Sequence, residues 1–128
     1  MSTILIKNAK LVRDNVKEAD VFVRDGVITK IGRVDRNADI VIDGTDKYLF
    51  YGFCDLHTHL REPGYEGKET IATGVRAAVR GGFTDILCMP NTDPVCDNRV
   101  VAEFISRTAK DEGFAHVYPV GAITKGLK

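Results

Sequence analysis

Seven residues near the middle of the chain, 55–61 with the sequence DLHTHLR, constrain the fold and the function more than any other segment. The polar members of this segment stand at every second position: Asp55, His57, His59 and Arg61. Residues two apart in a β-strand point to the same face, so this spacing predicts that the four polar side chains project together. Two neutral imidazoles aimed in one direction form half of a metal site, because histidine is a common ligand of zinc-like ions.

The neighbours of the two histidines strengthen this interpretation. An H-x-H pair alone is a weak signal, because exposed strands carry such pairs by chance. Here the apolar segment 53–57 is a plausible buried strand that leads into the pair, and Asp55 and Arg61 flank it. A divalent metal held by His57 and His59 would lower the pKa of water and supply hydroxide at neutral pH. Asp55 is a candidate to orient a ligand imidazole, and a solvated or helix-capping acid is the alternative.

Beyond residue 52 the chain alternates between strand and helix patterns. The predicted strands are residues 53–57, 83–89 and 115–120. Apolar residues at helical spacing fill 71–79 and 100–108, and glycines after each segment end the two helices. This order predicts an α/β fold with parallel strands joined by right-handed crossovers.

Two polar motifs fall at the same rim of this predicted sheet. In such folds the chemistry gathers at the carboxyl ends of the strands, where the histidine pair and the segment MPNT, 89–92, both lie. Arg61 could clamp a carboxylate with two parallel hydrogen bonds, and Asn91 can donate its amide to the same group. The alternatives are a surface salt bridge for Arg61 and a simple turn residue for Asn91.

The first 50 residues follow a different pattern. Their predicted strands are residues 3–7, 20–24, 27–31, 40–42 and 47–50. Asp25-Gly26 is a strong hairpin signal, since the turn needs positive φ, and Asp43-Gly44 marks another turn. We therefore predict a small antiparallel β unit over residues 1–50 and a second unit over residues 51–128.

Composition excludes several classes of function. Eighteen basic and eighteen acidic residues cancel, so no basic field would recruit nucleic acid or an anionic membrane. No apolar run approaches the roughly 20 residues of a membrane span, and charged residues interrupt the region where a signal peptide would need its apolar core. These absences predict a cytoplasmic protein. Cys54, Cys88 and Cys96 lack C-x-x-C spacing, so we interpret them as reduced thiols packed like small hydrophobic side chains.

Three further polar residues receive structural interpretations. His116 begins the third predicted strand, at the end opposite to the polar rim, and is interpreted as structural. Lys125 and Lys128 lie in the terminal loop on the rim side. They could meet an anion, but solvated lysines are the simpler interpretation.

Several of these motifs together resemble one known family. Residues 52–64, GFCDLHTHLREPG, resemble the first signature of the class I dihydroorotases of the amidohydrolase superfamily. Residues 81–84 and 89–92, GGFT and MPNT, resemble a second block, and 121–126, GAITKG, resembles the segment that follows. H-x-H is shared across the superfamily, whereas H-x-H-x-R-E-P-G combined with M-P-N-T is specific to dihydroorotases. The chain is identified as a member of that family, over its N-terminal portion.

The resemblance implies a zinc-dependent enzyme that interconverts N-carbamoyl-L-aspartate and L-dihydroorotate in de novo pyrimidine biosynthesis. His57 and His59 would be ligands in a centre of one or two zinc ions, and Arg61 and Asn91 would bind the carboxylate of dihydroorotate. The implied fold is a partial (β/α)8 TIM barrel, comprising the first three β/α steps and preceded by the small antiparallel β unit. Besides the small-molecule substrate, the implied partners are further copies in a homo-oligomer and aspartate transcarbamoylase.

The resemblance also implies groups that these residues do not supply. A full barrel needs roughly 200 residues or more. We expect the bridging ligand, two more histidines and the general-base aspartate of the family in a later part of the sequence, so no catalytic residue is assigned here. We therefore expect this chain alone to be inactive and its open sheet edges to promote self-association. Two alternatives stay open: a related cyclic amidase, such as a dihydropyrimidinase or hydantoinase, and a non-catalytic scaffold for aspartate transcarbamoylase.

Overall fold

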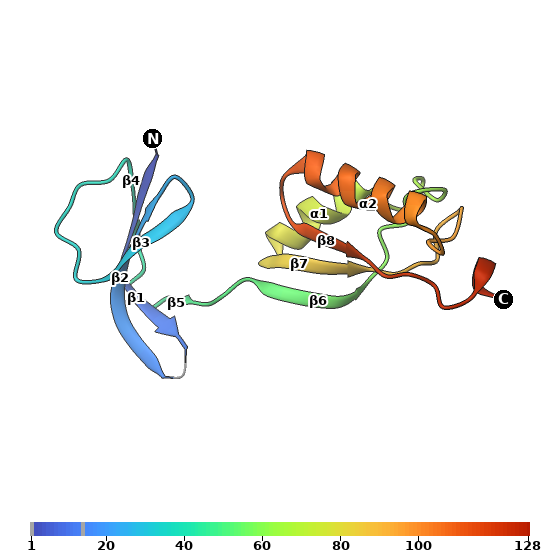
Figure 1. The fold of residues 1–128 in the computed structure, drawn as a ribbon. Coiled ribbons are helices and arrows are strands. Elements are labelled where there is room, and N and C mark those ends of the chain that lie inside the picture. The colour runs from blue at the N-terminus through green and yellow to red at the C-terminus, as the bar shows by residue number, and fades with distance from the viewer. Residues whose placement is uncertain (1, 14) are drawn as a thin grey trace. The chain divides into compact units, whose positions relative to one another are not determined.

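A computed structural model describes residues 2–13 and 15–128, and it divides the chain into the compact units Met1–Tyr51 and Gly52–Lys128 (Figure 1). The first unit is one five-stranded sheet in the order β3-β2-β1-β4, with β5 also paired to β1. Its strands are β1 (Thr3–Val12), β2 (Val16–Arg24), β3 (Val27–Gly32), β4 (Ile40–Asp43) and β5 (Tyr48–Leu49). The central strand, β1, therefore carries the pairing of all the others except β3.

The first sheet is mixed, which corrects the prediction of an antiparallel unit. β1, β2 and β3 pair antiparallel, whereas β4 and β5 both run parallel to β1. The predicted turn at Asp43-Gly44 does not fold the chain back on itself. The N–H of Gly44 donates to the carbonyl of Lys7 at 2.8 Å, and the N–H of Lys10 donates to the carbonyl of Lys47 at 2.9 Å. The chain therefore loops out briefly and continues along the same side of β1.

One carboxylate supports a bulge in β1. The register between β1 and β2 shifts between Ile6 and Ala9, where Asn8 has a φ of 56°. Asp20 accepts the N–H of Asn8 on Oδ1 at 3.0 Å and the N–H of Val34 on Oδ2 at 2.9 Å. These hydrogen bonds favour the charged carboxylate and lower the pKa of Asp20 below its ordinary value.

The second unit confirms the predicted alternation of parallel strands and helices. Its sheet has the order β6-β7-β8, and both helices lie on one face of it (Figure 1). The elements are β6 (Phe53–Thr58), α1 (Ile71–Arg80), β7 (Phe83–Cys88), α2 (Arg99–Glu112) and β8 (His116–Pro119). A short 3₁₀ turn at Lys125–Leu127 follows β8, so the described residues hold two helices and not a third strand–helix step. No helix within these residues has the length and apolar character needed to cross a membrane.

Local side-chain chemistry sets the ends of both helices. Thr70 caps α1, because its hydroxyl accepts the N–H of Thr73 at 3.1 Å and the hydroxyl of Thr73 accepts the N–H of Thr70 in return. Asn98 caps α2 by accepting the N–H groups of its first turn. Gly113 ends α2 with a φ of 70°, a left-handed conformation that suits glycine.

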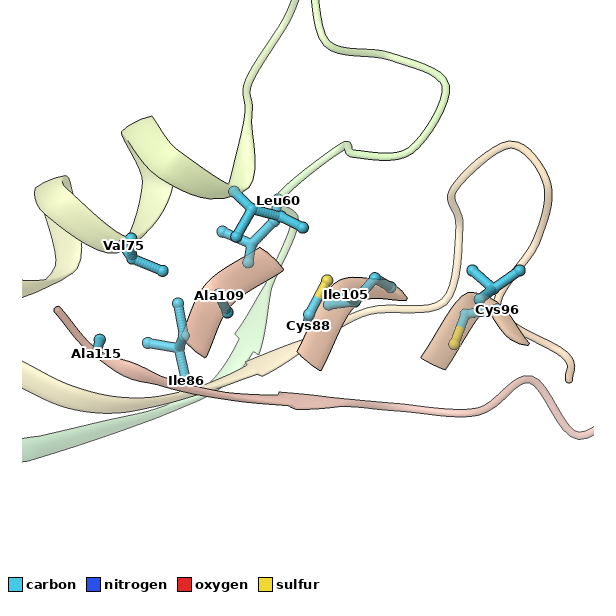
Figure 2. Packing of buried hydrophobic residues seen from close by; sticks show 10 residues of the cluster. Leu60, Val75, Ile86, Cys88, Cys96, Ile105, Ala109 and Ala115 are labelled. Atoms are coloured by element: carbon cyan, nitrogen blue, oxygen red, sulfur yellow. The ribbon is translucent and has the colours of Figure 1, made fainter. Parts of the chain in front are cut away.

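The helices pack on the sheet through one apolar cluster (Figure 2). Its buried members are Leu60, Ile71, Val75, Ile86, Cys88, Cys96, Val101, Ile105, Ala109 and Ala115. Leu60 is 1% exposed and belongs to the histidine segment, so the core holds that segment in place. Burial raises the pKa of the Cys88 and Cys96 thiols, as expected for thiols packed like hydrophobic side chains. That interpretation is wrong for Cys54, which is exposed.

The hydrogen bonds of Asp20 predict an acid-sensitive stability of the first unit. We expect Asp20→Asn to lower the free energy of unfolding by about 1 to 3 kcal/mol at pH 7, because hydrogen bonds to a charged group are lost. A carboxylate with a lowered folded pKa stabilises above its unfolded pKa, 3.8, and this stabilisation disappears as the pH falls through the folded pKa. Denaturant unfolding at several pH values measures both effects.

The matched control is Asp35→Asn, since Asp35 is exposed. The gap in unfolding free energy between the wild type and Asp20→Asn should close as the pH falls below about 4. A gap that is independent of pH, or equal for the two variants, would contradict this role of Asp20.

Candidate metal and carboxylate site

A bulge in β6 shapes the histidine segment. Asp55 pairs with Ile86 of β7 and Thr58 pairs with Cys88, and the register shifts between these two pairs. Three steps along β6 therefore match two steps along β7, so β6 carries one extra residue. Paired residues share a face of the sheet, which puts both Asp55 and Thr58 on the face of the buried Ile86 and Cys88. The strict two-residue alternation predicted for residues 55–61 is therefore interrupted between Asp55 and Thr58.

The two histidines nevertheless converge. Nε2 of His57 and Nε2 of His59 lie 3.2 Å apart, with the rings edge to face. Two nitrogens that each lie about 2.0–2.1 Å from a shared zinc ion, at a near-tetrahedral angle, are about 3.3 Å apart. The pair therefore has the donor atoms and the spacing of two ligands of one ion. Across residues 2–13 and 15–128 no group of three or more His, Cys, Asp and Glu side chains is placed to hold a metal.

The loop after β7 brings Asn91 to the histidine pair. Oδ1 of Asn91 lies 2.8 Å from Nδ1 of His59. The sequence placed both residues at the same rim but gave no sign of this contact. The adjacent pairing of β6 and β7, with Thr58 opposite Cys88, is what brings the two chain segments together. Three of the four predicted site residues, His57, His59 and Asn91, thus form one connected group.

Asp55 supports the backbone of the segment and not an imidazole ring. Its Oδ1 accepts the backbone N–H of His57 at 3.0 Å. This hydrogen bond is the main cause that lowers the pKa of Asp55 below its ordinary value. The carboxylate therefore stabilises the backbone at the bulge, and the contact with the His59 ring comes from Asn91 instead.

Arg61 stands two residues beyond His59, where the chain leaves the strand. It is half-buried and has a φ of 64°, an uncommon left-handed conformation for arginine. Its carbonyl accepts the N–H of Tyr65 at 2.9 Å and closes a turn. Among the described residues none forms a hydrogen bond or ion pair with the Arg61 guanidinium, so its five N–H donors are uncommitted. No hydrogen bond joins Arg61 to Asn91 among the described residues.

Backbone contacts tie the loop after β6 to the loop after β7. The N–H of Met89 donates to the carbonyl of Thr58 at 2.8 Å, and the N–H of Asp93 donates to the carbonyl of Pro63 at 2.9 Å. Gly64 permits this approach, because its φ is 99° and an added Cβ would lie 2.2 Å from the carbonyl oxygen of Asp93. The loop with Arg61 and the loop with Asn91 are therefore held against each other.

The second loop is also anchored from within. Thr92 is 4% exposed, and its hydroxyl donates to the carbonyl of Pro94 at 2.8 Å. The N–H of Cys96 donates to the carbonyl of Pro90 at 3.0 Å. These bonds close a compact loop, so Asn91 projects from a fixed support. Sequence analysis missed the anchoring role of Thr92, although its place beside Asn91 in the MPNT motif was visible.

The remaining polar residues singled out by the sequence have partners elsewhere. His116 lies with Nδ1 3.2 Å from Oδ1 of Asp85, and the hydroxyl of Tyr118 donates to the same oxygen at 3.1 Å. Nζ of Lys125 donates to the backbone carbonyl of Asp97 at 2.8 Å. Both contacts lie within the local structure and outside the histidine pair.

Comparison with protein families places these features in a known group. The model of a family described as dihydro-orotase-like matches residues 46–128. The dihydroorotase of Thermoanaerobacter sp. (strain X514) is 47% identical over 128 residues, which cover 98% of this chain and 30% of that protein. The dihydroorotase of Acetivibrio thermocellus is 50% identical over 110 residues, which cover 85% of this chain and 26% of that protein. The chain spans about 30% of the length of the curated relatives that it matches.

Solved structures of hydantoinases (dihydropyrimidinases) have a fold similar to that of this chain. The L-hydantoinase (dihydropyrimidinase) of Arthrobacter aurescens matches with a TM-score of 0.83 and 26% identity, over 94% of this chain and 28% of its own. The D-hydantoinase (dihydropyrimidinase) of a Thermus species matches with a TM-score of 0.70 and 30% identity, over 94% of this chain and 27% of its own. Each of these solved chains is larger than this one, which covers 28% and 27% of their lengths.

The close approach at Gly64 predicts that this position tolerates no side chain. We expect Gly64→Ala to lower the free energy of unfolding by at least about 1 to 3 kcal/mol, because alanine is strained at positive φ and its Cβ would meet the carbonyl of Asp93. The matched control is Gly67→Ala in the same loop, where nothing lies within 4 Å of an added Cβ. Denaturant unfolding compares the two, and equal effects would contradict the proposed contact between the loops.

Proposed function

The chain belongs to the dihydro-orotase-like family, and on this basis we propose that its second unit carries part of the active centre of a dihydroorotase. The proposed reaction is the reversible hydrolysis of L-dihydroorotate to N-carbamoyl-L-aspartate. Water adds to the ring amide carbonyl, the C–N bond breaks, and the nitrogen takes the proton. The single observation that carries the proposal is the 3.2 Å approach of the His57 and His59 Nε2 atoms beside Asn91.

The proposed metal is zinc, in a centre of one or two ions. His57 and His59 would hold it through Nε2, and their spacing suits a shared ion. When bound, zinc acts as a Lewis acid that polarises a carbonyl and makes water more acidic. The other ligands and the proton-transfer aspartate of such a centre are not assigned to any residue described here.

The proposed substrate contacts are two groups that can bind a carboxylate. Arg61 has an uncommitted guanidinium, which matches a carboxylate with two parallel hydrogen bonds. Asn91 uses its side-chain oxygen toward His59, which leaves its Nδ2 amide group as a donor. Backbone hydrogen bonds join the two loops, so the loops that carry the Arg61 and Asn91 donors are held together.

The fold of the whole protein, its location, its pathway and its partners are also part of the proposal. Residues 51–128 would form the beginning of a (β/α)8 metal-dependent hydrolase barrel, and residues 1–50 a separate small β unit. The protein would act in the cytoplasm, in pyrimidine biosynthesis, as a homo-oligomer, with aspartate transcarbamoylase as a possible partner. The similarity to dihydroorotases and to larger hydantoinase chains supports the hydrolase-barrel part of this proposal.

We expect the 128-residue chain alone to show no turnover of dihydroorotate, with or without added zinc. Two imidazoles do not complete a catalytic zinc site, which uses three protein ligands and an open position. The measurement is dihydroorotate consumption by the purified chain, compared with its His57→Ala variant. Zinc-dependent turnover well above that variant would contradict the expectation.

A chimaera tests the proposed function directly. The chain replaces the matching portion of the Thermoanaerobacter dihydroorotase, to which it is 47% identical. We expect zinc-dependent hydrolysis of dihydroorotate, abolished by His57→Ala. Arg61→Gln should lower kcat/KM about 10- to 150-fold, the equivalent of losing about 1.5 to 3 kcal/mol of hydrogen bonding to a charged group. The matched control is Lys68→Gln, an exposed cation of the same loop that should leave kcat/KM unchanged.

The same chimaera separates dihydroorotase from the related cyclic amidases. Hydantoinases (dihydropyrimidinases) share the fold, so they are the second candidate. Dihydrouracil lacks the carboxylate that Arg61 and Asn91 would bind. A preference for dihydrouracil over dihydroorotate, or an Arg61→Gln effect that is equal on both substrates, would favour the second candidate.

A further inference from the structure

We propose that Asn91 is a positioning residue that fixes the tautomer of His59, so that Nε2 presents a bare lone pair to the metal. This inference rests on the proposed zinc site but assigns Asn91 a task separate from substrate binding. The observation behind it is the 2.8 Å contact between Asn91 Oδ1 and His59 Nδ1. An amide oxygen can only accept a hydrogen bond, so the hydrogen belongs to Nδ1 of the imidazole.

The consequence for His59 follows from the chemistry of the neutral ring. A neutral imidazole carries one N–H, so hydrogen on Nδ1 leaves Nε2 as an acceptor. That is the form a metal requires, and ligand histidines commonly have their other ring nitrogen fixed in this way by an outer partner. His59 is half-buried, and Thr92 and the backbone bonds of its loop hold Asn91 in place. The contact is therefore built into the fold before any metal arrives.

The two histidines differ in this respect. Nε2 of His59 is an acceptor, so the 3.2 Å contact between the rings assigns the donated hydrogen to Nε2 of His57. His57 is exposed, and no described residue forms a hydrogen bond with its Nδ1. It can therefore move its proton to Nδ1 through water when a metal binds. The tautomer of His59 is therefore fixed before metal binding, whereas the tautomer of His57 can change.

Asn91 then joins the two halves of the site. Its oxygen faces the metal ligand, and its NH₂ group is the donor proposed for the substrate carboxylate. Asn91→Asp separates these tasks, because a carboxylate still accepts from Nδ1 but has no NH₂ to donate. Asn91→Ala removes both.

The test is the ring ¹⁵N spectrum of the 128-residue chain at neutral pH without metal, in which bare and protonated ring nitrogens are distinguished. We expect the wild type and Asn91→Asp to show His59 with hydrogen on Nδ1. We expect Asn91→Ala to lose this preference and to bind zinc about 10- to 100-fold more weakly in a calorimetric titration, the usual cost of removing an outer partner of a ligand. His116, whose Nδ1 contacts Asp85, is the internal control and should not change.

The wild-type spectrum can overturn the inference even if a variant fails to fold. Hydrogen on Nε2 of His59 in the wild type, or an unchanged tautomer in Asn91→Ala, would contradict it. The proposed function fails in a different way, namely if the chimaera shows no zinc-dependent hydrolysis of dihydroorotate. The two failures are therefore distinguishable.

Discussion

The pairing of β6 with β7 is the interaction on which the site depends. It sets the carboxyl ends of two parallel strands side by side, and the extra residue in β6 then redirects the segment that carries both histidines. The backbone bond between Met89 and Thr58 extends the pairing past the strand ends. This register helps to align the two segments, 32 residues apart in the sequence, that the 2.8 Å contact between Asn91 and His59 joins.

The hydrophobic core holds the histidine segment in place through Leu60. Leu60 lies between His59 and Arg61 in the sequence, and it is buried in the cluster under α1 (Figure 2). Gly74 of α1 lets the helix come close, since an added Cβ there would lie 2.4 Å from a methyl group of Leu60. The polar residues of the site are thus adjacent to a tightly packed residue, and such packing lets a site keep its geometry without its ligand.

Much of this arrangement could be predicted from the sequence, because it follows local rules. Apolar periodicity and the glycines that follow each helical segment located the helices, and the βαβ order located the rim. The parallel course of β4 and β5 could not be predicted, since Asp43-Gly44 has the chemistry of a hairpin turn and only long-range bonds to β1 show otherwise.

The candidate site also has features that could be predicted from the sequence and features that could not. Spacing alone identified His57 and His59 as a pair, since their side chains do converge. The same spacing did not predict the bulge in β6, because a bulge is set by the register with a neighbouring strand and not by the strand's own residues. The contact of Asn91 with His59 likewise depends on two segments that only tertiary structure brings together.

The central claim is that His57 and His59 bind one metal ion together, and a double-mutant cycle tests it most directly. Zinc affinity of the 128-residue chain is measured by calorimetry for the wild type, His57→Ala, His59→Ala and the double variant, with His116→Ala as the control. If the two imidazoles share one ion, each single variant loses nearly as much binding free energy as the double variant, and the control loses none. Independent, additive losses, or a wild type that binds zinc no better than the double variant, would contradict the claim.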